Sequence, residues 1–120
     1  MHKEFSMIKG IRLIVYPVKD VAQATALYSK LLGVAPYFEK PYYVGFKVGD
    51  QEIGLDPNGH AEGMTGSVIY WQVSDIKESL QSYRDAGAQV QQEVKDVGGG
   101  NLIASVADAD GNVIGLSQVA

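Results

Sequence analysis

The alternation of apolar and polar positions predicts two copies of one set of structural elements. Residues 8–18 alternate and then become continuously apolar, which is typical of a strand buried on most of its surface. Apolar positions then recur at helical spacing between Asp20, a good N-cap residue, and Gly33, a residue type that commonly ends helices. The chain therefore opens with a strand followed by an amphipathic helix.

The rest of the first half reads as a hairpin followed by a linker. Pro36 and Pro41 indicate a loop or an irregular edge strand. Residues 43–48 and 51–56 alternate as strands on either side of a Gly-Asp dipeptide, which favours a tight turn. Residues 56–67 are dense in turn formers and predict a linker.

The second half repeats this order. Residues 67–73 predict a strand, and a helix follows between the N-cap residue Asp75 and Gly87. The remaining predicted strands are 89–94, 102–107 and 112–118. The pattern is thus βαβββ, written twice.

Individual residues support a duplication. Asp20 matches Asp75 and Tyr28 matches Tyr83 at a constant offset. Each half closes on a similar phrase, which is Glu52-Ile-Gly-Leu55 in the first half and Val113-Ile-Gly-Leu116 in the second. Two similar halves must share a surface, so the binding site is expected between them.

These elements predict an α+β fold of paired βαβββ modules forming a curved mixed sheet around a concave cleft. One domain is expected over 7–120, with module 1 at about 7–57, module 2 at about 66–120 and an N-terminal extension at 1–6. The two helices would cover the convex side of the sheet.

Composition narrows the function classes. The 120 residues are 46% hydrophobic and 20% charged, which suits an ordinary globular core. A net charge of −4 argues against a non-specific nucleic-acid binder, and the lack of cysteine excludes disulfides and thiolate chemistry. No apolar run is long enough for a membrane span, and the first residues lack a signal-peptide core, so a cytoplasmic location is expected.

Several polar features have ordinary structural interpretations. His60 and Glu62 lie in the linker, where a solvated loop is favoured over a metal or acid–base site, and His2 lies in an expected frayed tail. Residues 98–100 are three glycines, but a strand rather than a helix follows them, so a flexible loop at the cleft rim is favoured over a phosphate loop.

Two motifs resemble the vicinal oxygen chelate superfamily, which includes glyoxalase I, bleomycin-resistance proteins and extradiol dioxygenases. Pro17-Val-Lys-Asp20, followed by Ala24, Tyr28 and Leu32-Gly33, is similar to the start of that family's first module. Asp108-Ala-Asp-Gly-Asn-Val-Ile-Gly115 is similar to its closing turn and last strand, with Ala109 where proline is usual. The resemblance runs from about Met7 onward and implies the paired-module fold.

The resemblance also locates four positions where metal-dependent members carry His, Glu or Gln. These ligands lie on the first and last strand of each module, and the corresponding positions here hold Leu13, Gly54, Val68 and Gly115. None of these residues can bind a metal through its side chain. The family's metal site is therefore expected to be absent, with no cofactor in its place.

Strand parity predicts which side chains face the cleft. The predicted cleft residues are Leu13, Val15, Tyr43, Lys47, Glu52, Gly54, Val68, Tyr70, Gln72 and Gly115, with Tyr42 as an alternative to Tyr43. The opposite parity assigns Tyr16, Phe46 and Trp71 to the core. Glu52 is interpreted as an exposed cross-strand partner of Lys47, with acid–base catalysis as the alternative.

The conclusion from the sequence is a metal-independent small-molecule-binding protein that sequesters an aromatic or cationic compound. Glycines at positions 54 and 115 would let a ligand approach the sheet. The first alternative is a lyase, isomerase or dioxygenase-like enzyme of the same superfamily, using Glu52, Tyr43 or unconventional metal ligands. The second is a degenerate dimerisation or regulatory domain, whose tyrosines would fill the cleft themselves. A homodimer is expected, with no nucleic-acid or membrane partner.

Overall fold

The computed structural model describes residues 8–120 and contains the predicted elements in the predicted order. The first half comprises β1 (Ile8–Pro17), α1 (Val21–Leu32), β2 (Phe38–Lys40), β3 (Tyr43–Val48) and β4 (Gln51–Asp56). The second half comprises β5 (Val68–Val73), α2 (Ile76–Asp85), β6 (Gln89–Asp96), β7 (Leu102–Ala107) and β8 (Val113–Gln118). The α+β class with two βαβββ modules is confirmed, whereas His2 and the extension at 1–6 lie outside the described residues.

The chain divides into two compact units, which are described separately below. We call residues 12–68 the N-unit, and residues 8–11 together with 69–120 the C-unit. The boundary falls inside β1, because Ile8 at its start packs against the core of the C-unit. The remainder of β1 pairs with β4 inside the N-unit.

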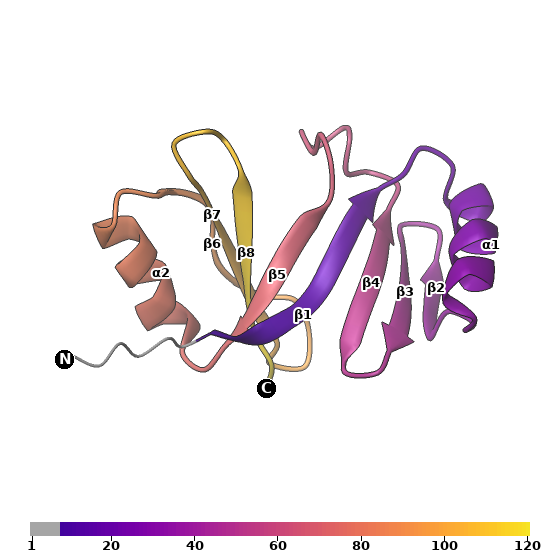
Figure 1. The fold of residues 1–120 in the computed structure, drawn as a ribbon, viewed down its shortest axis with the longest axis horizontal. Helices are drawn as coiled ribbons and strands as arrows, with labels where there is room; N and C mark the ends of the chain where they lie inside the picture. Colours follow the sequence, from indigo (N-terminus) through magenta and orange to yellow (C-terminus); the bar gives the residue numbers. More distant parts are fainter. Residues whose placement is uncertain (1–7) are drawn as a thin grey trace. The chain divides into compact units, whose positions relative to one another are not determined.

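The N-unit is a four-stranded mixed sheet with one helix (Figure 1). Its strand order is β2-β3-β4-β1, with β1 parallel to β4 and the other neighbours antiparallel. Phe46 and Leu55 are fully buried where α1 covers the sheet, and Tyr16 packs against them. The prediction that Tyr16 and Phe46 belong to the core is therefore confirmed, and the opposite face of this sheet is left for the predicted site residues.

The C-unit has the equivalent arrangement. Its strand order is β5-β8-β7-β6, with β5 parallel to β8. Ile76 and Leu80 of α2 pack with Val106 and Leu116 of the sheet to form its buried core. Trp71, also assigned to the core from the sequence, is only partly buried and lies in register with Leu116.

Both helices begin where the sequence predicts. The carboxylates of Asp20 and Asp75 each accept a hydrogen bond of 3.0 Å from a backbone N–H three residues later. Gly33 ends α1 with φ of 73°, a left-handed conformation that glycine adopts without a Cβ clash. The second helix ends at Asp85 instead, with Ala86 as its C-cap residue and Gly87 one position later.

Two features of the sheets and helices go beyond the sequence expectations. The strand predicted at 89–94 continues to Asp96, with register shifts against β7 that mark bulges.

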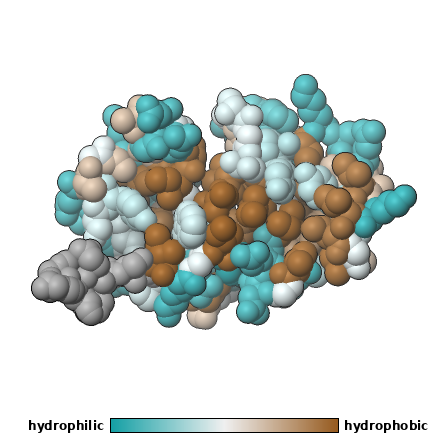
Figure 2. Space-filling model, in the orientation of Figure 1, coloured by the Kyte–Doolittle hydropathy of each residue, from teal (hydrophilic) through white to brown (hydrophobic). Residues whose placement is uncertain are grey.

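Leu27 and Leu31 on the outer side of α1 are 61% and 71% exposed, and Figure 2 shows apolar surface at the α1 end of the N-unit. Within residues 8–120, no helix is long and apolar enough to cross a membrane.

Candidate ligand-binding face

Six of the predicted site residues share one face of the N-unit sheet, opposite the face that α1 covers. They are Leu13, Val15, Tyr43, Lys47, Glu52 and Gly54. Leu13 and Lys47 both lie in register with Glu52, and Val15 lies in register with Gly54. Because residues paired in register project to the same side of a sheet, these side chains gather on one surface.

Three more predicted residues, Tyr70, Gln72 and Gly115, share a face of the C-unit sheet, whereas Val68 is the last residue of the N-unit. Tyr70 lies in register with Gly115, and Gln72 lies in register with Ser117, which is 7% exposed. Val68 is the first residue of β5 and is nearly buried. That these residues line one cleft together with the N-unit face stays a prediction.

Tyrosine side chains cover the glycines of both faces. A Cβ atom added at Gly54 would lie 1.8 Å from the hydroxyl of Tyr43, and one added at Gly115 would lie 2.4 Å from the ring of Tyr70. The expectation that these glycines leave space for a ligand is therefore corrected, because the rings of the chain itself occupy that space. An aromatic ring packed over a strand glycine shields backbone that would otherwise be bare.

The two tyrosines come from different places in the repeat. Tyr43 belongs to β3 and reaches across to β4, whereas Tyr70 belongs to β5 and lies beside β8. In the βαβββ order these strands are not equivalent. The two modules therefore cover their strand glycines with tyrosines from strands that are not equivalent in the repeat.

A polar cluster surrounds Glu52 on the N-unit face. One carboxylate oxygen of Glu52 lies 2.6 Å from a guanidinium nitrogen of Arg12, and the other accepts a 2.5 Å hydrogen bond from the hydroxyl of Tyr37. Lys47 does not pair with Glu52 as expected; its Nζ lies over the Tyr37 ring, 4.7 Å from the centroid. The predicted Glu52–Lys47 ion pair is corrected, because Arg12 and Tyr37 already engage both oxygens of Glu52.

The hydroxyl of Tyr37 is held in its protonated form. Burial, the hydrogen bond to Glu52 and the negative charge of that carboxylate together raise the pKa of Tyr37 to about 12. Although Tyr37 as a whole is 51% exposed, its hydroxyl ends on Glu52, whose side chain is only 15% exposed. The phenol therefore acts as a hydrogen-bond donor at neutral pH.

Aromatic side chains continue this surface towards β2. The Phe38 ring lies 6.2 Å from the Tyr42 ring and 6.3 Å from the Tyr43 ring, measured between centroids. Tyr42 is 59% exposed. We call Tyr37, Phe38, Tyr42 and Tyr43 the aromatic face; it lies beside a small polar cluster.

The residues at the four family positions do not fit a metal. Leu13, Val68 and the two glycines supply no donor atom, and Tyr43 fills the space that a ligating side chain at position 54 would need. Among residues 8–120 there is also no group of three or more His, Asp or Glu side chains that could hold an ion.

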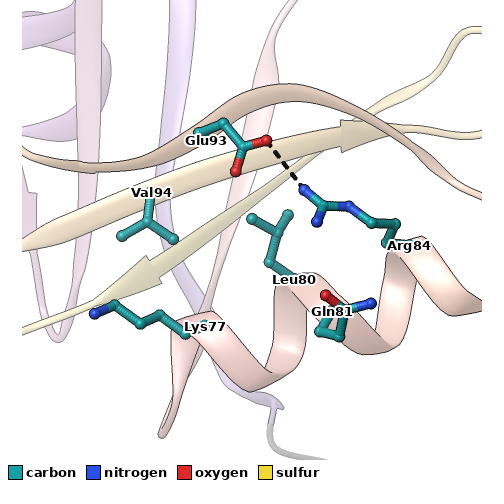
Figure 3. A pocket seen from close by; sticks show the side chains of 6 residues that line it. All are labelled: Lys77, Leu80, Gln81, Arg84, Glu93 and Val94. Carbon is teal, nitrogen blue, oxygen red and sulfur yellow. Dashed lines mark hydrogen bonds and ion pairs between the residues drawn. The ribbon is translucent and has the colours of Figure 1, made fainter.

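A separate hollow of about 310 Å³ lies between α2 and β6 in the C-unit (Figure 3). Its lining residues are Lys77, Leu80, Gln81, Arg84, Glu93 and Val94. Arg84 and Glu93 form a 3.0 Å ion pair with exposed side chains, as the dashed line shows. Because Arg84 and Glu93 already pair with each other in an exposed position, they contribute little free energy to the binding of a ligand in this hollow.

Sequence reasoning missed three contributors to the N-unit face. Strand alternation assigns Arg12 to the side opposite Leu13, yet its guanidinium pairs with Glu52. Tyr37 precedes β2 and belongs to no periodic pattern. Gly45, whose added Cβ would lie 2.9 Å from the Tyr37 ring, could have been found by counting outward from the hairpin turn, where it pairs with Gly54.

Comparison with known proteins identifies the family. The model of the Glyoxalase/Bleomycin resistance protein/Dioxygenase superfamily matches residues 10–116. The chain belongs to this superfamily. The resemblance seen in the sequence motifs is thereby confirmed. A search of curated proteins finds no match.

Solved structures of this superfamily share the fold at low sequence identity. Methylmalonyl-CoA epimerase from Mycobacterium tuberculosis is 18% identical with a TM-score of 0.74, over 99% of this chain and 93% of that one. A superfamily member from Vibrio splendidus is 18% identical with a TM-score of 0.70, over 90% and 98% of the two chains. The Mn(II)-bound glyoxalase from Novosphingobium aromaticivorans is 22% identical with a TM-score of 0.73, over 95% of this chain and 40% of that one. At these identities the comparisons establish the fold.

Proposed function

We propose that this protein is a metal-independent small-molecule-binding member of the glyoxalase/bleomycin-resistance superfamily that sequesters an aromatic compound on its N-unit face. The observation that carries the proposal is the packing of Tyr43 over Gly54, which fills the place of a family metal ligand with an aromatic ring. Aromatic surface with a few polar groups suits a planar ligand.

The exposure of the aromatic face supports binding there. Tyr37 and Tyr42 are each more than half exposed, although rings of this size gain from being covered. The Phe38 ring contacts both the Tyr42 ring and the Tyr43 ring. A planar compound stacked on Tyr37 or Tyr42 would therefore bury ring surface without rearranging the sheet.

The enzyme alternative is less well supported by the same geometry. A general base must have a carboxylate oxygen free to take a proton from substrate. Both oxygens of Glu52 are engaged, one by Arg12 and one by Tyr37. Four of the solved structures with this fold are methylmalonyl-CoA epimerases, so an activity on a thioester remains the natural assay for this alternative.

A thermal-shift series with aromatic compounds tests the proposal. A ligand that binds the native state raises the apparent Tm by mass action. We expect aromatic compounds to raise the Tm of the wild-type protein and to raise it much less in Tyr42→Ala. Leu27→Ala, which removes an equally exposed apolar side chain outside the face, serves as the control and is expected to respond like wild type.

Two results would contradict the proposal. One is turnover of a thioester substrate that disappears in Glu52→Gln, which would favour the enzyme. The other is no ligand response at all together with strong self-association, which would favour the dimerisation or regulatory domain. The predicted homodimer and cytoplasmic location stay predictions; light scattering on the purified protein measures the first.

A further inference from the structure

The charges beside the aromatic face are unequal. Arg12 and Lys47 each carry one positive charge, and Glu52 carries the negative charge between them. Arg12 and Tyr37 already satisfy the Glu52 carboxylate. Among the charged groups that contact Tyr37 and Glu52, the surplus is therefore positive, although the protein as a whole has a net charge of −4.

Lys47 carries that surplus. Within residues 8–120 its ammonium group has no carboxylate partner and lies over the Tyr37 ring instead. The side chain is exposed, where a cation–π contact is weak. An anionic group arriving beside Tyr37 could therefore take a charge-assisted hydrogen bond from Lys47 at little cost.

The hydrogen bond from Tyr37 to Glu52 fixes the position of the ring next to that ammonium group. Tyr37 also lies close over Gly45, where a Cβ would come within 2.9 Å of the ring. The ring is thus held at its hydroxyl and supported from below. Because the Lys47 ammonium group lies over this ring, a ligand ring stacked there would displace it towards the anionic substituent of the ligand.

We propose that the ligand of this face is a planar aromatic anion, such as an aryl carboxylate, with its ring on Tyr37 and its anionic group on Lys47. The inference rests on the proposed function and deepens it, because it assigns the sign of the ligand's charge. The sequence leaves an aromatic or a cationic compound open. The positive charge of Lys47 favours an aromatic compound that carries a negative charge.

Three probes of nearly the same shape test the sign of the charge. Benzoate, benzamide and benzamidinium share a planar ring and differ in carrying a negative, zero or positive charge. Titrations followed by NMR are expected to show benzoate binding about two- to fivefold more tightly than benzamide, the ratio that a single solvent-exposed charge pair gives. Benzamidinium should bind most weakly, and raised salt should reduce only the benzoate affinity.

Two lysine variants show whether Lys47 is responsible. Lys47→Met should remove the preference for benzoate over benzamide. Lys95→Met removes an exposed strand lysine of the C-unit and should behave like wild type. Both side chains are exposed, so neither replacement threatens the fold.

The outcomes separate the two proposals. Equal binding of all three probes, or preference for benzamidinium, would overturn the charge assignment and leave an aromatic-binding protein. A benzoate preference that survives in Lys47→Met would overturn the role of Lys47. Failure of every probe to bind would overturn the proposed function as well.

Discussion

At the scale of single residues, the strand glycines Gly54 and Gly115 are each covered by a tyrosine ring. The Cβ of an alanine at Gly54 would meet the far end of the Tyr43 side chain, at the hydroxyl. At Gly115 the nearest atoms belong to the root of the Tyr70 ring, 2.4 and 2.7 Å away. The ring atoms nearest the backbone can move aside only through a change of χ1, whereas the hydroxyl at the far end moves aside on a small rotation.

We therefore expect Gly115→Ala to destabilise the protein more than Gly54→Ala, with both costs in the range of about 1–3 kcal/mol typical of overpacking. Urea denaturation measures the free energy of unfolding. Gly66→Ala is the control, because nothing lies within 4 Å of its added Cβ and it should change stability little. In a Tyr43→Ala background the cost of Gly54→Ala should shrink; an unchanged cost would contradict the packing described here.

Tyr37 gives a second prediction at this scale. Its pKa is raised from 10.0 to about 12, so between pH 10 and 12 the unfolded chain loses this proton and the native protein keeps it. Stability from this group is therefore fully present below pH 10 and is lost as the pH rises to about 12. Tyr37→Phe should show a shallower fall of Tm over that range, with ultraviolet absorbance of tyrosinate reporting the titration. An identical fall of Tm in both proteins would contradict the raised pKa of Tyr37.

At the scale of elements, helix starts follow local chemistry closely. The place of Asp20 and Asp75 before an apolar periodic run predicts both as N-caps, and each accepts the expected backbone hydrogen bond. The second helix has an additional tie, because the Ile76 N–H donates to the side chain of Gln118 in β8, 42 residues away. No local pattern could reveal that contact.

Loss of the α1 N-cap should lower the free energy of unfolding by about 1 kcal/mol, since Asp20→Ala leaves a backbone N–H of α1 without its acceptor. Asp20→Asn should restore most of that stability, because the amide oxygen can accept the same bond. Chemical denaturation measures all three proteins. Glu62→Ala, in the exposed linker, is the control for loss of an acidic side chain. Equal stability of Asp20→Ala and wild type would contradict the cap.

At the scale of the whole molecule, the fold belongs to a superfamily with metal-binding members, but within residues 8–120 no cluster of His, Asp or Glu side chains could hold an ion. We expect Ni²⁺, Zn²⁺ and Mn²⁺ to leave the apparent Tm unchanged, because the four family positions hold Leu13, Gly54, Val68 and Gly115. Gly54→Glu should fail to create a response, since Tyr43 fills that space. A Tm rise of several degrees with stoichiometric Zn²⁺, reversed by chelator, would show that other residues bind metal.

Sequence patterns alone predict the element order, the helix caps, the family and the shared face of Leu13, Glu52 and Lys47. They do so because helical and strand periodicities, capping and turn chemistry are local, and because a repeat lets each position be checked against its twin. Only the tertiary structure showed that Arg12 and Tyr37 take both oxygens of Glu52 and that tyrosines cover Gly54 and Gly115. Those contacts depend on the direction and reach of long side chains, which strand parity does not specify.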